Sequence, residues 1–289
     1  MTSSNDPMDS RLTDEWHRGL PGAAGEIGSQ GSYPSCTIGT RYMRRRDFIT
    51  LMGLASSLPQ SAWSQSSTCE SAPGTVCSPD IPLQYDDTRF DRNEASGAVK
   101  LPPNGTVSNK SITETNGTAS IVIGNGGTIR NCRVNSRECV RIGGSGTFLI
   151  DHCYLEARGV ENDHADVIQA YSPGSRGILK VTNTAIATHD IAATAGLFIA
   201  DNWTGTIELE NVAFIGGGVG FGLRVHPDTG GDNIVRLKNV FFVPPFGYGP
   251  FYFKDFGGRK NIIELWENVR IATISNGQLV PRKPLPKPR

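Results

Sequence analysis

Three cationic side chains fall in two short apolar segments near the C-terminal end of the sequence. Arg224 and His226 alternate with Leu223 and Val225, and Lys254 belongs to the next such segment. Alternate side chains of a strand point to opposite faces, so burial of Leu223 and Val225 turns Arg224 and His226 outward. Such groups can hold an anion, and His or Lys of suitable pKa can move a proton. The pattern therefore predicts a cationic candidate catalytic surface.

Uncharged side chains of neighbouring segments are predicted to extend this surface. Tyr252 shares the segment of Lys254, and the segment 166–171 lies two repeats before Arg224. The residues that we expect there to contact a ligand are Gln169, Tyr171 and Tyr252.

A nearby loop has a different chemistry, because Glu161, Asp163 and Asp166 place three carboxylates within six residues. Carboxylate oxygens are the ligands that Ca²⁺ prefers. The spacing matches no compact calcium loop such as the EF-hand. We therefore treat these residues as a candidate calcium site, and a solvated turn as the alternative.

A sequence motif that is repeated six times positions all of these groups. Each copy has a short alternating apolar segment, an Asn or His, two residues, and another apolar residue. The spacings between these anchors are 21, 31, 28, 28 and 29 residues, which is typical of a repeat architecture. The anchors are Asn131, His152, Asn183, Asn211, Asn239 and Asn268.

The repeats lack a helical period and are shorter than a propeller blade of about 40 residues. They predict an all-β fold, a right-handed parallel β-helix of about six to eight coils that stack at about 4.8 Å. Asn adopts the left-handed conformation readily, so we expect the anchors to form a ladder that bonds the backbone amides of the next coil. His152 occupies the same position, and we favour a ladder role for it over a catalytic one.

The rest of the chain divides by composition. Residues 1–42 are rich in Ser, Gly and Pro, and are interpreted as disordered or as a start codon assigned too early. We expect an export signal at 43–64, an N-terminal cap at 65–103, the β-helix at 104–279, and a flexible Pro/Lys/Arg tail at 280–289 that forms no sheet.

The segment 43–64 has basic residues, a mildly apolar run and small residues at its end. This order is typical of an export signal and not of a transmembrane span. The run Arg44-Arg45-Arg46 followed by Asp47-Phe48 resembles a bacterial twin-arginine signal, which implies export of a folded protein to the periplasm or the medium.

The cysteine content and the charge balance limit which disulfides and which partners are expected. An oxidising compartment permits disulfides, and Cys69–Cys77 would be a local clip. Cys132 and Cys153 follow successive anchors, so they either form a bridge or pack as small apolar residues, with Cys139 a competing partner for Cys132. Lys plus Arg and Asp plus Glu both number 28, which argues against a nucleic-acid partner.

The segment Leu149-Ile150-Asp151-His152-Cys153 resembles the W-I-D-H signature of pectate lyases, and the segment Asp166–Gln169 is similar to their D-G-L-x-D segment. Leu149 and Gln169 depart from that pattern, and an R-x-P-R segment is missing. The resemblance implies a parallel β-helix that acts on acidic polysaccharides, often with calcium.

Three activities are compatible with these residues. A lyase would remove a proton from a uronic acid polymer, with Arg224 as base or carboxylate clamp and His226 or Lys254 assisting. A glycoside hydrolase needs two carboxylates about 5–9.5 Å apart, and the candidates are Asp166, Asp190, Asp201 and Asp228. The third activity is carbohydrate binding without turnover by a protein that we expect to be monomeric.

The segment Asp201-Asn202-Trp203 supports the binding activity. It places an aromatic ring beside polar groups on a loop, where a sugar could stack, and Phe246 and Tyr248 would extend the platform. In the alternative interpretation, Trp203 closes the edge of a coil.

Overall fold

The computed structural model describes residues 81–159, 164–171, 176–189, 193–200, 203–218, 220–227 and 230–289. These residues form strands, together with one short 3-10 helix, η3 (Thr88–Phe90). No helix in the described residues is long and apolar enough to span a membrane. The signal at 43–64, Cys69 and Cys77 lie outside the described residues.

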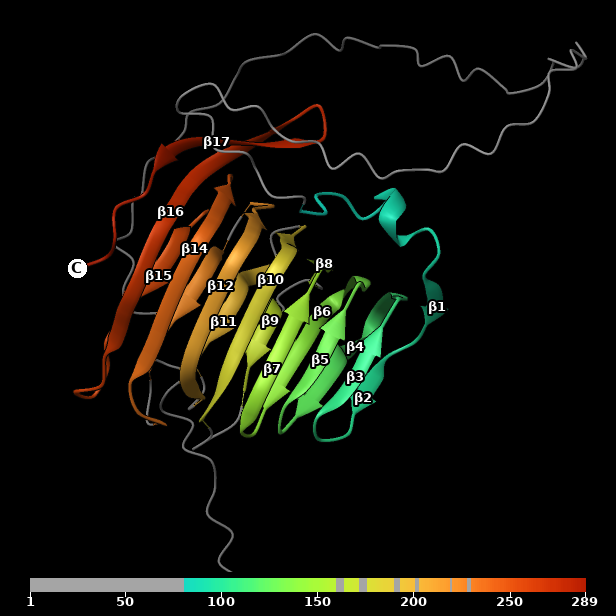
Figure 1. Ribbon diagram of the computed structural model, residues 1–289, viewed down its shortest axis with the longest axis horizontal. Helices are drawn as coiled ribbons and strands as arrows, with labels where there is room; N and C mark the ends of the chain where they lie inside the picture. Colours follow the sequence, from blue (N-terminus) through green and yellow to red (C-terminus); the bar gives the residue numbers. More distant parts are fainter. Residues whose placement is uncertain are drawn as a thin grey trace, which may run out of the picture. The chain divides into compact units, whose positions relative to one another are not determined.

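The strands belong to one continuous sheet, which winds along one axis and so has three faces, called here the anchor, covered and open sheets (Figure 1). The anchor sheet ends at the anchors and contains β3 (Gly105–Ser108), β5 (Gly127–Arg130), β7 (Gly146–Asp151) and the first parts of β10 (Arg176–Thr188), β12 (Thr204–Ile215), β14 (Asn233–Val243) and β16 (Asn261–Ser275). The covered sheet follows the anchors and contains β1 (Glu94–Ser96), β8 (Tyr154–Ala157), the first parts of β4 (Lys110–Gly124) and β6 (Arg133–Gly143), and the later parts of β10, β12, β14 and β16. The open sheet contains β2 (Val99–Leu101), the later parts of β4 and β6, β9 (Ala165–Ala170), β11 (Ala193–Ile199), β13 (Phe221–Val225) and β15 (Gly249–Phe253).

Each strand pairs in parallel with the equivalent strand of the next coil, so equivalent residues stack. One inward row of the anchor sheet shows the result. Each of its side chains is at most 1% exposed, and the row runs through Ile129, Ile150, Val181, Leu209 and Leu237. The prediction of an all-β parallel β-helix is confirmed.

The predicted Asn ladder is present, although its hydrogen bonds differ from expectation. All six predicted anchors have φ between 49° and 55°, in the left-handed region. Asn239 Nδ2 donates to Asn211 Oδ1 at 3.0 Å, and Asn211 Nδ2 donates to Asn183 Oδ1 at 3.1 Å. Each anchor thus bonds to the side-chain amide of the neighbouring anchor and not to the backbone amides that the sequence suggested, because stacked coils already pair their backbone groups.

His152 has the ladder backbone, with φ of 53°, but imidazole cannot continue a chain of amides. Asp151 takes over this function. Its Oδ1 accepts from Asn183 Nδ2 at 3.1 Å and from Thr182 Oγ1 at 2.6 Å, and lies 2.8 Å from His152 Nδ1. Partial burial acts to raise the pKa of Asp151, but these hydrogen bonds outweigh it and hold the pKa below its usual value.

The described cysteines are all buried and unbridged. Cys132 and Cys153 occupy equivalent positions of successive coils, as predicted, since their neighbours Arg133 and Tyr154 pair directly. Burial raises the pKa of Cys139 to about 12. These thiols therefore pack as small apolar side chains, and neither of the predicted bridges of Cys132 is formed.

The N-terminal segment differs from the predicted end cap. β1 and β2 already belong to the coils, since both pair with β4. The preceding residues 81–90 lie against the outer face of the covered sheet, where Ile81 and Phe90 share an apolar cluster with Ala213 and Phe241. This face needs a cover because its outward side chains are apolar.

The prediction that the tail at 280–289 forms no sheet is also wrong. Residues Gln278–Pro284 form β17, which pairs antiparallel with β16 after a turn at Asn276-Gly277. Leu285 then donates its N–H to Val269 O and accepts from Trp266 Nε1, both at 2.9 Å. Proline is tolerated here because an edge strand needs donors on one side only.

Candidate functional site

The outer face of the open sheet carries one row of large polar and aromatic side chains. The row crosses five consecutive coils, and direct strand pairing sets its order as Arg141, Gln169, Phe198, Arg224 and Tyr252. Arg224 thus lies between two aromatic residues. The sequence correctly placed Gln169 two coils before Arg224 and Tyr252 one coil after it.

A second row lies two residues further along the chain, directly after the ends of β9, β13 and β15. Lys254 N–H donates to Val225 O, which places Lys254 beside His226. Tyr171 belongs to the same row, two residues after Gln169, and is 46% exposed. We call the two rows together the cation–aromatic strip, which consists of Arg141, Gln169, Tyr171, Phe198, Arg224, His226, Tyr252 and Lys254.

Aromatic rings position two basic side chains of this strip. The guanidinium carbon of Arg224 is 4.7 Å from the centre of the Phe198 ring, which is cation–π geometry. The rings of His226 and Phe256 have centroids 4.9 Å apart. Arg224 and His226 are therefore oriented by neighbours and remain only partly buried.

The two ends of the strip differ in charge. Arg141 donates to Glu138 through two hydrogen bonds, of 2.9 and 2.6 Å, and Glu138 is 2% exposed. Lys254, at the other end, is exposed and forms no ion pair with the described residues. The exposed charge of Lys254 therefore lies at the β15 end of the strip.

Sequence reasoning missed Phe198 and Arg141. Phe198 lies in β11, and its partnership with Arg224 depends on the strand register. The loops between anchors and these strands vary in length, and β11 pairs with β9 through an irregular register. The outward-facing aromatic side chain of Phe198 is the sequence feature that could have indicated this position.

Two predicted platform residues belong to the core. Trp203 is fully buried, donates from Nε1 to Gly144 O at 3.2 Å, and packs edge-on against Phe148 at 6.4 Å. Phe246 packs against the core and meets Phe242 edge-on at 6.1 Å. The interpretation of Trp203 as a plug is correct and its predicted contact with substrate is wrong. Asp201 lies outside the described residues.

The predicted calcium loop is only partly described. Glu161 and Asp163 lie outside the described residues, as do Asp190 and Asp228 of the hydrolase alternative. Asp166 is 3% exposed and accepts from Thr194 Oγ1 at 2.7 Å. The described part of the chain contains no group of three or more His, Cys, Asp or Glu side chains that could hold a metal. Asp166, the one candidate calcium ligand among the described residues, thus already accepts a hydrogen bond from the protein. Calcium binding stays a prediction.

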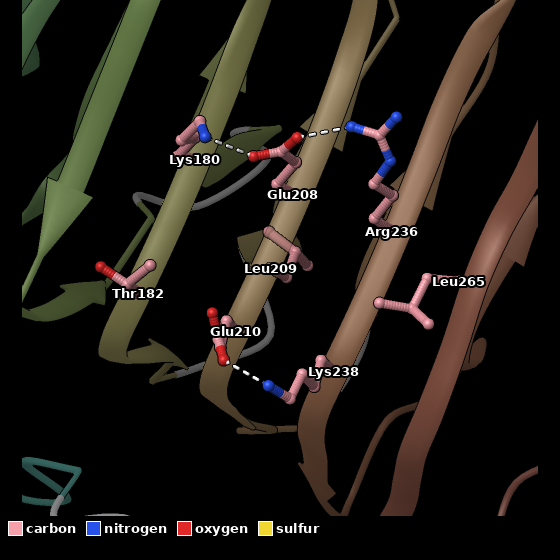
Figure 2. Close-up of a pocket in the computed structure, with 8 residues that line it drawn as sticks. All are labelled: Lys180, Thr182, Glu208, Leu209, Glu210, Arg236, Lys238 and Leu265. Carbon is pink, nitrogen blue, oxygen red and sulfur yellow. Dashed lines mark hydrogen bonds and ion pairs between the residues drawn. The ribbon is translucent and has the colours of Figure 1, made fainter.

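The anchor sheet offers a second outward face, with a shallow depression of about 210 Å³ (Figure 2). Its charged groups neutralise one another: Glu208 binds Lys180 and Arg236, both at 2.7 Å, and Lys238 binds Glu210 at 2.9 Å. Ligand pockets are usually larger, about 300–1,000 Å³. This face therefore stabilises the stack and is the weaker candidate for a ligand site.

The ion pairs of Glu208 predict a dependence of stability on pH. Partial burial acts to raise the pKa of Glu208, but Lys180 and Arg236 outweigh it and hold the pKa below the reference value of 4.5. Because the folded-state pKa is the lower one, the stabilisation is complete above pH 4.5 and is lost as the pH falls through the folded-state pKa.

We expect Glu208→Gln to lower the free energy of unfolding at pH 7 by less than about 1 kcal/mol, since the pairs are exposed and screened. Thermal melts between pH 7 and 3 should show a smaller pH dependence in this variant. Glu114→Gln is the control, because Glu114 pairs with no described cation. An equal loss in both variants would contradict the role of the ion pairs.

The fold and the strip define the class of protein, a parallel β-helix with a cation–aromatic face along its axis. Neither the family models, nor the curated proteins, nor the solved structures contain a match to this chain.

Proposed function

We propose that this protein is an exported lyase that binds an acidic, uronic-acid-containing polysaccharide along the cation–aromatic strip. The observation that carries the proposal is the placement of Arg224 between Phe198 and Tyr252, with His226 and Lys254 beside it. Five stacked strands make a strip about 19 Å long. A linear polymer matches such a strip, because cations neutralise its carboxylates and aromatic faces stack on its sugar rings.

The proposed reaction is β-elimination. Arg224 holds the carboxylate of the sugar and stabilises the negative charge that develops there. His226 or Lys254, in its neutral form, accepts the C5 proton. The electrons of the C5–H bond form the C4=C5 double bond, and the C4–O bond breaks. The leaving oxygen takes up a proton from the other of these two groups or from water.

The resemblance of Asp151-His152 and the 166–169 segment to pectate lyases supports this choice of substrate. Export to the periplasm or the medium, from the signal at 43–64, would bring the protein to such polymers. A contribution of calcium from Glu161, Asp163 and Asp166 is tested by adding Ca²⁺ or a chelator.

The test is the ultraviolet absorbance of the unsaturated product after incubation with pectate, alginate and neutral glycans. We expect product from an acidic polymer, and Arg224→Ala should lower the rate about a hundredfold. Arg224→Lys should retain part of the activity, because it keeps the charge but loses the planar fork. Lys180→Ala, a cation of the anchor sheet, is the control and should leave the rate unchanged.

The other outcomes distinguish the alternatives. New reducing ends without the absorbance would show a glycoside hydrolase and overturn the elimination. Binding without product would show a carbohydrate-binding protein without turnover. Unchanged activity in Arg224→Ala would overturn the role of Arg224.

A further inference from the structure

Three aromatic rings gather at the β13–β15 end of the open sheet. Phe221 begins β13, Tyr248 precedes β15, and Tyr252 lies within β15. The Phe221 ring is 5.4 Å from that of Tyr248 and 5.3 Å from that of Tyr252, with interplanar angles of 41° and 30°. Phe221 thus lies between two tilted tyrosine rings. We call these three residues the aromatic triplet.

The triplet is not part of the core. Tyr248 is 63% exposed, and Phe221 and Tyr252 are only partly buried. Neither tyrosine hydroxyl hydrogen bonds to another described residue. Phe246, two residues before Tyr248, packs inward on Phe242 instead. An exposed group of rings with two available hydroxyls is typical of a binding surface.

The triplet continues the strip. Tyr252 pairs directly with Arg224. Lys254, which has no ion pair among the described residues, follows two residues later, just after the end of β15. When Arg224 binds the carboxylate of one sugar of a polymer, the adjacent sugar of that polymer therefore lies at the triplet. Negative charge on that ligand complements Arg224 and Lys254, whereas the rings offer an uncharged face.

We infer that the aromatic triplet is a subsite that stacks one sugar ring of the polysaccharide next to the sugar whose carboxylate binds Arg224. The inference rests on the proposed function. It adds which kind of sugar the protein accepts at the position next to the sugar bound by Arg224. Stacking recognises the C–H face of a sugar and not its charge. This subsite therefore accepts a neutral or esterified sugar, and the substrate class is an acidic polymer that includes uncharged residues.

The test is calorimetric binding of an acidic oligosaccharide and its methyl-esterified counterpart, at low and high salt. We expect Tyr248→Ala to weaken binding of both ligands about five- to tenfold at either salt concentration. Tyr248→Phe should bind like the wild type if stacking dominates. Arg224→Ala should weaken only the acidic ligand, and more strongly at low salt. Leu265→Ala, an exposed apolar residue of the anchor sheet, is the control.

The experiment distinguishes an error in the proposed subsite from an error in the proposed function. Unchanged binding of both ligands by Tyr248→Ala and Tyr252→Ala, with acidic binding lost in Arg224→Ala, would overturn the subsite alone. A loss in the tyrosine variants with no effect of Arg224→Ala would support the subsite and overturn the proposed role of the cations. No binding of either ligand by the wild type would overturn both. Melting temperatures establish that each variant is folded.

Discussion

Trp203→Ala is expected to lower the free energy of unfolding by about 3–5 kcal/mol. The Trp203 ring is fully buried and packs against Phe148, and Nε1 donates to Gly144 O. The ring also lies over Gly177, where an added Cβ would come within 3.3 Å of it. Alanine would leave a cavity between coils and an unpaired carbonyl at Gly144.

Urea unfolding followed by circular dichroism measures this loss without relying on tryptophan fluorescence. Trp203→Phe is the matched control, because it retains much of the volume and loses the hydrogen bond, so a smaller loss is expected. A Trp203→Ala protein of normal stability that no longer binds polysaccharide would restore the interpretation of Trp203 as a sugar platform.

Asn211→Val is expected to cost about 2–4 kcal/mol. Asn211 has φ of 55°, which a β-branched residue adopts only with strain. Its side chain also links two coils, since it donates to Asn183 and accepts from Asn239. Valine would introduce the strain and remove both hydrogen bonds at once.

Asn211→Gly separates these two contributions. Glycine tolerates the positive φ and removes only the hydrogen bonds, so about 1–2 kcal/mol is expected. Chemical unfolding of both variants gives the comparison. Equal losses of unfolding free energy in the two variants would show that backbone strain contributes nothing. A glycine variant as stable as the wild type would show that the hydrogen bonds of the ladder contribute nothing.

The repeat could be predicted from the sequence because the left-handed anchor position tolerates few residue types. Asn183, Asn211 and Asn239 mark the corner between the anchor sheet and the covered sheet. The alternation of apolar and polar residues on either side of each Asn determines which side chains point inward. The outward placement of Arg224 and its neighbours followed from the same alternation. Those predictions depended on local backbone geometry alone.

The errors concern segments whose structure depends on tertiary contacts. The outer face of the covered sheet carries Ala185, Ala213 and Phe241, which are fully buried although they point away from the coil interior. An apolar outward row is a sign that another segment covers it, and residues 81–90 do so, with Leu279 of β17 in the same apolar cluster. Their own sequences carry little periodicity, so local pattern could not place them.

The constant spacing of 28 residues from β10 to β12 and from β12 to β14 makes the length of the protein adjustable. Thr204, Gly205 and Thr206 pair with residues 28 positions earlier, and Ile207 and Leu209 with residues 28 positions later. A segment of that size, duplicated or deleted in place, would preserve the register of these paired strands. The chain could thereby gain or lose one step of about 4.8 Å while its cross-section stayed constant. Copying a unit that already folds against itself would therefore lengthen the stack, and the open sheet with it, one coil at a time.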